Sequence, residues 1–327
     1  MRIFINGFGR IGRSVLRAFL QTPHHWPEVE IAGINDIADA AMCSYLFEFD
    51  SVFGPWRGKV ALHDARLDID GRAIPMHRVS DISTLDLRGV DLVLECTGRA
   101  DGREMAARGC RAGAERVLVS GPSRAADYTV VLGANERGLR ADHRIISNAS
   151  CTTNALAPLA ALLDAEWGIE TGSMTTIHCY TGSQPTVDTP AGDFARSRAA
   201  ALSMVPTTTS AQRLLSEVLP DLAGRIEGSA VRVPVASVSA VDLAVMTRRP
   251  AMAEAVNAAF REAGGVIGAT DRALVSSDLR ARRESIVMAC PETRVTKGGM
   301  LRVFGWYDNE WGFSCRMLDM AVRLRML

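Results

Sequence analysis

The sequence has very few lysines, although it is rich in basic residues. Only Lys59 and Lys297 are lysines among the 37 basic side chains, which leaves 35 arginines. A reaction that passes through a lysine Schiff base is therefore not favoured, because that chemistry needs a lysine in the site. Anionic ligands are expected to be bound by arginine, whose planar guanidinium contacts phosphate and carboxylate groups through two parallel hydrogen bonds.

The chain also lacks closely paired cysteines, a long apolar run and a net charge. Its seven cysteines stand far apart, so neither a zinc module nor a disulfide framework is predicted, and no metal site is expected. No apolar stretch reaches the length of a membrane span, and no signal-peptide pattern is present, so we expect a cytoplasmic protein without a membrane partner. The formal charge of zero argues against nucleic acid as a partner.

The first motif present is a glycine-rich turn between a strand and a helix. The chain has 327 residues, 47% of them hydrophobic, which is enough for two domains with their own cores. Residues 3–6 are typical of a strand, Gly7, Gly9 and Gly12 follow, and an amphipathic helix comes next. This order is the dinucleotide fingerprint, in which the glycines allow a tight turn, close approach of a pyrophosphate, and packing of helix on strand.

An acidic residue after the second strand fits the same motif. Residues 29–34 are apolar and lead into Asn35 and Asp36. Asp36 stands roughly 20 positions past the glycines, where a carboxylate binds the ribose hydroxyls of the cofactor. Its negative charge opposes a 2′-phosphate, so the sequence predicts NAD rather than NADP.

Further strands and helices alternate through the first half of the chain. Residues 91–96 form a continuous apolar run of the kind buried in a parallel sheet, and Thr97 and Gly98 follow it directly. Ser120 follows the next strand, and Arg78 follows a series of short strands over residues 60–76. Ligands of parallel sheets bind at the carboxyl ends of the strands. We therefore predict an α/β fold with a Rossmann-type parallel sheet domain.

A cysteine stands at the start of the next predicted helix. Residues 147–154 are typical of a strand end that turns into a helix, with Ser150 as its cap and Cys151 as its first residue. The unpaired N–H groups and the positive end of the helix dipole favour a thiolate, the nucleophilic form. Alternatively, the cysteine is a small buried apolar residue. The neighbouring hydroxyls and amide of Thr152, Thr153 and Asn154 favour the nucleophile.

One histidine stands out among the six of the sequence. His178 lies on an apolar strand at residues 173–181, whereas His63, His77 and His143 are expected in polar, surface contexts. If His178 faces Cys151, the two form a thiol and imidazole pair suited to attack on a carbonyl carbon. The alternative is a hydrogen-bonded polar residue without a catalytic role. The sequence alone does not decide whether the two side chains meet.

The remainder of the chain is predicted to form a domain of a different kind. Residues 182–204 show no periodicity and form a long irregular segment, and a run of hydroxyls that ends at Thr209 and Ser210 precedes a helix. Arg232 lies within a strand, where it is either buried beside an anion or exposed on an edge strand. The later strands have longer connections, which predicts an α+β domain with a mixed or antiparallel sheet.

Taken together, these motifs resemble the phosphorylating glyceraldehyde-3-phosphate dehydrogenase family over nearly the whole chain. The matching segments follow one another in the family's order: residues 6–13, 147–154, 175–178, 232–234 and 306–312. The resemblance implies a Rossmann domain of residues 1–150 and 310–327, and a catalytic domain of residues 151–309. It also implies a homotetramer.

The resemblance assigns a role to individual residues. It implies that Cys151 is the nucleophile and His178 its base. The implied cofactor-binding residues are Gly7, Gly9, Arg10, Ile11, Gly12, Asp36, Arg78, Thr97, Gly98, Ser120 and Asn309, the last as a partner of the nicotinamide amide. The implied ligands of the phosphorylated aldehyde substrate and of inorganic phosphate are Ser150, Thr152, Thr181, Arg196, Thr209, Ser210 and Arg232.

Several positions leave alternatives open. Ser210 and Arg213 replace a glycine and a lysine that are usual in the family, and Thr189 stands where NAD-specific members have leucine, which leaves limited NADP use open. Residues 139–145 lean toward the sister family of erythrose-4-phosphate dehydrogenases. A different class of function is a non-catalytic Rossmann protein that senses NAD or binds nucleic acid, which needs neither Cys151 nor His178.

Overall fold

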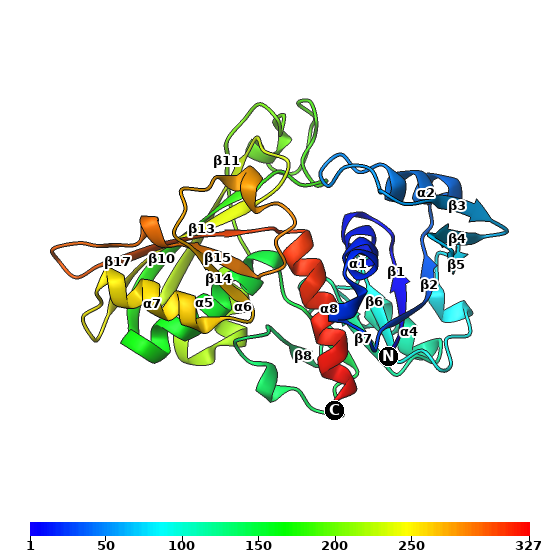
Figure 1. The fold of residues 1–327 in the computed structure, drawn as a ribbon, viewed down its shortest axis with the longest axis horizontal. Coiled ribbons are helices and arrows are strands. Elements are labelled where there is room, and N and C mark those ends of the chain that lie inside the picture. Colours follow the sequence, from blue (N-terminus) through cyan, green and yellow to red (C-terminus); the bar gives the residue numbers. More distant parts are fainter. The chain divides into compact units, whose positions relative to one another are not determined.

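Residues 1–327 are described by a computed structural model, in which the chain divides into two units. The first unit comprises Met1–Val130, Arg137–Ala149 and Ser314–Leu327, and the second comprises Val131–Glu136 and Ser150–Phe313. Figure 1 traces the chain through both units from blue to red. None of the helices is both long and apolar enough to cross a membrane.

The first unit contains a nine-stranded sheet in the order β3-β4-β5-β2-β1-β6-β7-β9-β8. The strands β2, β1, β6, β7 and β9 are all parallel, while β3, β4 and β5 form an antiparallel meander at one edge. The predicted Rossmann-type sheet is thereby confirmed. The strands are β1 (Arg2–Asn6), β2 (Glu30–Asn35), β3 (Val60–His63), β4 (Arg66–Ile69), β5 (Arg72–His77), β6 (Leu92–Glu95), β7 (Arg116–Val119), β8 (Tyr128–Thr129) and β9 (Ile145–Ser147).

The helices of the first unit connect these strands. They are α1 (Arg10–Gln21), α2 (Ala40–Glu48), α3 (Arg103–Ala106) and α4 (Arg108–Arg111), with short 3-10 turns at Pro23–His25 and Ile82–Thr84. The C-terminal helix α8 (Trp311–Arg325) belongs to this unit from Ser314 onward. There, Trp26 donates to the Asp319 carboxylate over 2.6 Å.

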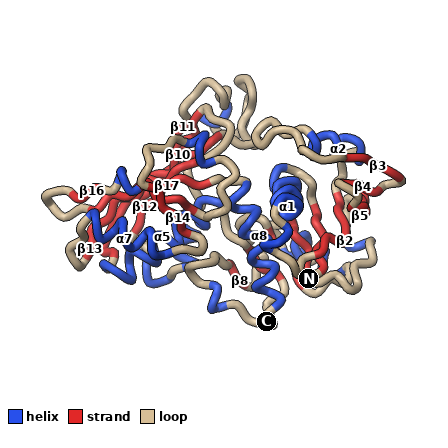
Figure 2. Tube along the Cα trace, in the orientation of Figure 1, coloured by secondary structure: helices blue, strands red, loops and turns tan.

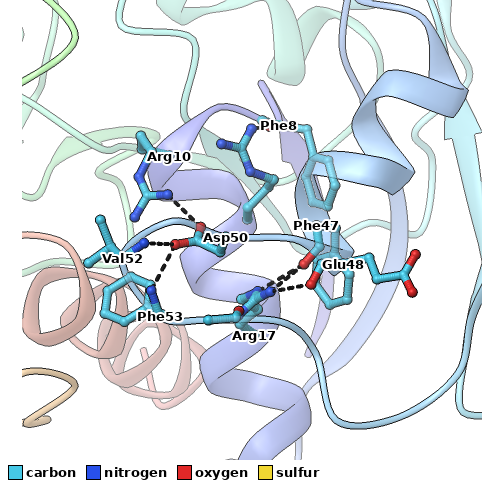
Figure 3. A network of polar contacts seen from close by, with 10 residues as sticks. Phe8, Arg10, Arg17, Phe47, Glu48, Asp50, Val52 and Phe53 are labelled. Atoms are coloured by element: carbon cyan, nitrogen blue, oxygen red, sulfur yellow. Dashed lines mark hydrogen bonds and ion pairs between the residues drawn. The ribbon is translucent and has the colours of Figure 1, made fainter.

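A buried arginine fixes the loop that follows α2. Arg17 on α1 is 1% exposed, and its guanidinium donates to the backbone carbonyls of Phe47, Glu48 and Gly54. Figure 3 shows the neighbouring Arg10–Asp50 ion pair, whose carboxylate also accepts from the backbone N–H groups at the start of the same loop. A buried guanidinium is tolerated here because carbonyl oxygens satisfy its donors.

The second unit contains an eight-stranded mixed sheet. Its order is β11-β12-β10-β13-β17-β15-β14, with β16 paired to β17. The pair β10–β12 is parallel, whereas β10–β13 and β13–β17 are antiparallel, so the predicted mixed sheet is confirmed. The strands are β10 (Ile169–Cys179), β11 (Val205–Thr207), β12 (Ile226–Val233), β13 (Ser239–Thr247), β14 (Ile267–Thr270), β15 (Ile286–Ala289), β16 (Arg294–Val295) and β17 (Leu301–Tyr307).

Three helices pack against this sheet, and Figure 2 shows two of them, α5 and α7, in blue beside its red strands. They are α5 (Cys151–Trp167), α6 (Ala211–Val218) and α7 (Ala253–Ala263), and short 3-10 turns lie at Ala195–Ser197, Pro220–Leu222, Ser276–Leu279 and Cys290–Glu292. Eleven of the 17 residues of helix α5 are buried, which its largely apolar sequence allows, and the helix continues through Pro158. Cys151, its first residue, is partly buried.

Candidate active site

Cys151 is the first residue of α5, as its sequence context predicts. The cap is Ser150, whose hydroxyl accepts a hydrogen bond from the Thr153 backbone N–H over 3.1 Å. Ala149, the residue before the cap, has a φ of 54°. A non-glycine residue in this left-handed region is strained, and such strain is concentrated at functional sites.

The structure brings Cys151 and His178 together. The Cys151 Sγ lies 3.6 Å from His178 Nε2, and His178 is only 5% exposed near the end of β10. A nucleophile and a base within hydrogen-bond reach of each other are the arrangement that nucleophilic catalysis requires. The sequence left open whether the two side chains meet, because their contact depends on how α5 packs against β10.

Tyr307 sets the distance between those two elements. Its hydroxyl lies 2.8 Å from Thr152 Oγ1 on α5 and 2.8 Å from Thr176 Oγ1 on β10, and its ring meets the His178 ring edge-on. Tyr307 is buried, which raises the pKa of its hydroxyl, so the group stays protonated and able to donate. Sequence reasoning missed Tyr307 and Thr176. The available signal was the alternation of apolar residues along 301–307, which directs Tyr307 to the interior.

The cavity beside Cys151 has a volume of about 290 Å³ and is rich in donors. It contains two guanidinium groups and six hydroxyls but no carboxylate, so its chemistry suits a phosphate. Its lining residues are Ser150, Cys151, Thr152, Thr176, His178, Arg196, Thr208, Thr209, Ser210, Ala230 and Arg232. Every residue predicted to bind substrate or inorganic phosphate is in this set except Thr181, whose hydroxyl instead pairs with Ser183 over 2.9 Å.

Arg232 enters this cavity from an interior strand. Strand β12 lies between β11 and β10, so the alternative of an exposed arginine on an edge strand is wrong. In the parallel pairing of β10 with β12, Arg232 is the direct register partner of His178. Its Nη1 lies 2.6 Å from His178 Nδ1 and 3.1 Å from the Cys179 carbonyl oxygen.

Burial controls the protonation of both reactive groups. Burial and, second, the positive charge of Arg232 lower the pKa of His178 to about 4, so the imidazole is neutral at pH 7. Burial raises the pKa of the Cys151 thiol, while Arg232 and the N–H groups at the helix start act in the opposite direction. The predicted helix effect is present, but burial outweighs it, and the two groups form a neutral thiol and imidazole pair.

Asn309 also lies in the second unit, just after β17. Its Oδ1 accepts from the Cys179 thiol over 3.1 Å and from the Ser239 hydroxyl over 3.4 Å. With Oδ1 engaged in this way, the Nδ2 group of the amide is the free end that can donate to a ligand.

A second cavity, of about 210 Å³, lies in the first unit. It is at the carboxyl ends of β1, β2 and β6, where ligands of such sheets bind. Of the predicted cofactor-binding residues, Gly7, Gly9, Asp36 and Thr97 line it. The others it contains are Asn6, Asn35, Ile37, Val79, Ser80, Ile82, Glu95, Cys96, Arg99, Met105 and Arg108.

The remaining predicted cofactor-binding residues of this unit do not line that cavity: Arg10, Ile11, Gly12, Arg78, Gly98 and Ser120. Arg10 pairs with Asp50, and Arg78 donates to the Ile37 carbonyl over 3.2 Å. Gly12 packs under the glycine turn, where an added Cβ would lie 2.1 Å from the Gly7 carbonyl oxygen.

Sequence reasoning also missed a polar network on the cavity floor. Asn35 Nδ2 donates to Asn6 Oδ1 over 2.8 Å, and Asn6 Nδ2 donates to the Glu95 carboxylate over 2.5 Å. Glu95 accepts further hydrogen bonds from the backbone N–H and hydroxyl of Thr97. The signal was a polar residue at the end of each of three apolar strands. These three residues lie side by side because β2, β1 and β6 are neighbours in the sheet, an order that the sequence does not show.

One histidine prediction is wrong. His143 was expected at the surface, but it is 6% exposed and stacks on the Tyr128 ring with centroids 5.1 Å apart. Its Nδ1 accepts from the Arg140 backbone N–H over 3.2 Å. The residues around His143 in the sequence are polar, so the sequence gave no indication that the Tyr128 ring would cover it.

Comparisons with known proteins match both units. Residues 1–103 match the family model described as "Glyceraldehyde 3-phosphate dehydrogenase, NAD binding domain", and residues 150–309 match "Glyceraldehyde 3-phosphate dehydrogenase, C-terminal domain". Relatives named glyceraldehyde-3-phosphate dehydrogenase include proteins of Pseudomonas aeruginosa (47% identical, covering 99% of this chain and 98% of the relative) and Xanthobacter flavus (44%, covering 100% and 99%). A Bacillus subtilis relative is 42% identical over 98% of this chain and 97% of its own.

Proposed function

The chain belongs to the glyceraldehyde-3-phosphate dehydrogenase family, and from this premise we propose that it oxidises glyceraldehyde 3-phosphate to 1,3-bisphosphoglycerate with NAD and inorganic phosphate. It is an NAD-dependent dehydrogenase, since both family domains and the names of its relatives agree on that activity. The proposal of this particular reaction rests on the cavity beside Cys151 in the second unit. The observation that carries it is the pairing of Cys151 Sγ with His178 Nε2 beside two arginines.

The proposed reaction uses these groups in a fixed order. Cys151 Sγ attacks the aldehyde carbon while its proton passes to His178 Nε2, which returns it to the carbonyl oxygen and gives a thiohemiacetal. His178 takes that hydroxyl proton back as the carbon is oxidised to a thioester on Cys151. NAD, when bound, supplies the hydride acceptor. Inorganic phosphate then attacks the thioester carbon, and the Cys151 sulfur leaves as the acyl phosphate forms.

The cationic and hydroxyl groups would hold the two phosphates of this cycle. Arg196 and Arg232 can each form charge-assisted hydrogen bonds to a phosphate, and Ser150, Thr152 and Thr209 add hydroxyl donors within the same cavity. Arg196 is already oriented, because its Nε donates to the Thr207 hydroxyl over 2.7 Å. The covalent bond to Cys151 keeps the substrate in the site through both steps. One phosphate site would bind the phosphate of the substrate during oxidation, and the other would bind the inorganic phosphate that attacks the thioester.

The first-unit cavity fits NAD. Gly7 has a φ of 93°, which an L side chain rarely adopts, and an added Cβ at Gly9 would meet nothing within 4 Å, so a ligand can approach the backbone there. The Asp36 carboxylate accepts from the Phe8 and Ala38 backbone N–H groups over 2.6 and 2.9 Å, which holds it at the end of β2. We propose that Asp36 binds the adenosine ribose and that the glycine turn binds the pyrophosphate.

Two glycine variants separate cofactor binding from folding. Gly9→Ala should leave the urea unfolding midpoint unchanged, because its Cβ meets no protein atom within 4 Å, yet weaken NAD binding roughly 10- to 100-fold by blocking the pyrophosphate. Gly12→Ala should lower stability by about 1–3 kcal/mol, because its Cβ would lie 2.1 Å from the Gly7 carbonyl oxygen. The measurements are calorimetric titration with NAD and urea unfolding. Unchanged NAD affinity in Gly9→Ala would contradict the assignment.

The substrate is tested by comparing two phosphorylated aldehydes. We expect kcat/KM to be higher for glyceraldehyde 3-phosphate than for erythrose 4-phosphate, and turnover to need inorganic phosphate as well as NAD. A reversed preference would assign the chain to the sister activity instead. Absence of NADH formation from either aldehyde would contradict the proposed function. The homotetramer and the cytoplasmic location stay predictions.

A further inference from the structure

We propose that Tyr307 is a positioning residue for inorganic phosphate, because its hydroxyl orders a row of three hydroxyl groups so that the proton of Thr152 points into the cavity beside Cys151. This inference rests on the proposed function and adds a residue on which one of its phosphate sites depends. It begins from the two 2.8 Å contacts of the Tyr307 hydroxyl, with Thr152 Oγ1 and with Thr176 Oγ1.

The three hydroxyls of this row are enclosed by protein. Thr176, Tyr307 and Thr152 are only 1%, 2% and 4% exposed. A buried hydroxyl without a hydrogen-bond partner costs free energy, so the contacts with Tyr307 stabilise both threonine side chains where they lie. Burial raises the pKa of the Tyr307 hydroxyl, so this group keeps its proton at neutral pH. The row therefore contains three protons, one on each oxygen.

The single proton of the phenol limits the row to two orders. Tyr307 can donate to only one threonine and has to accept from the other. If it donates to Thr152 and accepts from Thr176, the Thr152 proton is free for another acceptor. In the opposite order, the free proton belongs to Thr176. Both threonines line the cavity, so each order presents one hydroxyl donor of the row to a ligand there.

The surroundings of Thr152 favour the first order when an anion is bound. Thr152 is the second residue of α5, where N–H groups without an intrahelical partner and the positive end of the helix dipole attract an anion. Thr176 lies within β10, whose backbone groups pair with β12 and β13 instead. An anion can only accept, so a phosphate at the start of α5 binds the Thr152 proton and leaves Tyr307 as the donor to Thr152.

Tyr307 also holds the Thr152 side chain in one rotamer. A threonine in a helix has two accessible χ1 rotamers, because its hydroxyl can bond to different acceptors. The contact with Tyr307 selects one of them, and Tyr307 itself is fixed at the end of β17, where it pairs with Ser239 on β13. A donor that already points into the cavity binds an anion more tightly, because less rotamer freedom is lost on binding.

The test is a phosphorus NMR titration of inorganic phosphate into the full-length protein, with saturating NAD so that the nucleotide cavity is filled. Tyr307→Phe should raise the dissociation constant about 3- to 10-fold, and Thr152→Val, which removes the donor itself, about 10-fold or more. The double variant should bind phosphate as weakly as Thr152→Val alone, because without the Thr152 hydroxyl Tyr307 has no donor to orient. Additive losses would contradict the proposal, as would an unchanged constant in Tyr307→Phe.

Thr176→Val distinguishes the two orders of the row. In the proposed order Thr176 only donates to Tyr307, so this variant should weaken phosphate binding less than Tyr307→Phe does. A loss as large as that in Thr152→Val would make Thr176 the donor to phosphate and overturn the proposal. Tyr45→Phe, which removes a hydroxyl from an exposed tyrosine on α2, is the matched control and should bind phosphate like the wild type.

A purely structural role for Tyr307 has a different kinetic signature. Phenylalanine keeps the ring that meets His178 edge-on, so Tyr307→Phe should raise KM for inorganic phosphate more than KM for glyceraldehyde 3-phosphate. Equal changes in the two KM values would mean that the variant disturbs the whole site, and the proposal would be wrong. If the protein formed no NADH from either aldehyde, the proposed function would fail, while the NMR titration would still decide whether Tyr307 orders a phosphate site.

Discussion

Replacing Cys151 with serine should reduce NADH formation from glyceraldehyde 3-phosphate by about 10⁴-fold or more. The serine hydroxyl would occupy the same place at the start of α5, but it is a far weaker nucleophile than a thiolate and cannot form a thioester. Serine is close in size to cysteine, so the cap at Ser150 and the packing of α5 should be retained. The measurement is the steady-state rate with saturating NAD and inorganic phosphate.

Two controls make this result specific to Cys151. Cys110→Ser alters a partly buried cysteine in the first unit, whose thiol contacts the Glu115 carbonyl over 3.9 Å and the Arg144 side chain, and should retain wild-type turnover. The NAD affinity of Cys151→Ser should also stay close to that of the wild type, because none of the residues lining the nucleotide cavity is altered. A variant that keeps more than a tenth of the rate would show that Cys151 is not the nucleophile, and would favour the non-catalytic alternative.

The sequence predicted those parts of the site that local chemistry determines. The glycine spacing at Gly7, Gly9 and Gly12, between an apolar strand and an amphipathic helix, predicts a tight turn, and a hydroxyl at Ser150 before an apolar helix predicts a cap. Both features depend on neighbours within a few residues of the chain. For that reason the helix that begins at Cys151 and the turn that follows β1 could be placed without a structure.

Contacts that depend on strand order and register could not be predicted in the same way. Arg232 meets His178 because β12 pairs directly with β10, and the two residues are 54 positions apart in the sequence. Tyr307 joins Thr152 to Thr176 from a strand still further along the chain. Burial of the pair and the charge of Arg232 determine its protonation, so the sequence identified the reactive groups but not the state in which they are held.

Replacing His178 with asparagine should lower kcat/KM by about 10²- to 10⁴-fold, the usual contribution of a positioned general base. Asparagine offers a polar group of similar reach toward the Cys179 carbonyl and Arg232, but it cannot accept the proton of Cys151 or of the thiohemiacetal. The measurement is kcat/KM for glyceraldehyde 3-phosphate across pH. His63→Asn, at an exposed position in β3, is the matched control and should behave as the wild type.

The loss in His178→Asn should also depend on pH in a definite direction. Burial raises the pKa of the Cys151 thiol, so without a base the thiolate fraction grows tenfold per pH unit up to that raised pKa. The wild type, in which His178 accepts the proton, gains less over the same range. The ratio of wild-type to variant kcat/KM should therefore shrink as pH rises from 7 to 9. A ratio that stays constant over this range would mean that His178 acts on another step than deprotonation of Cys151.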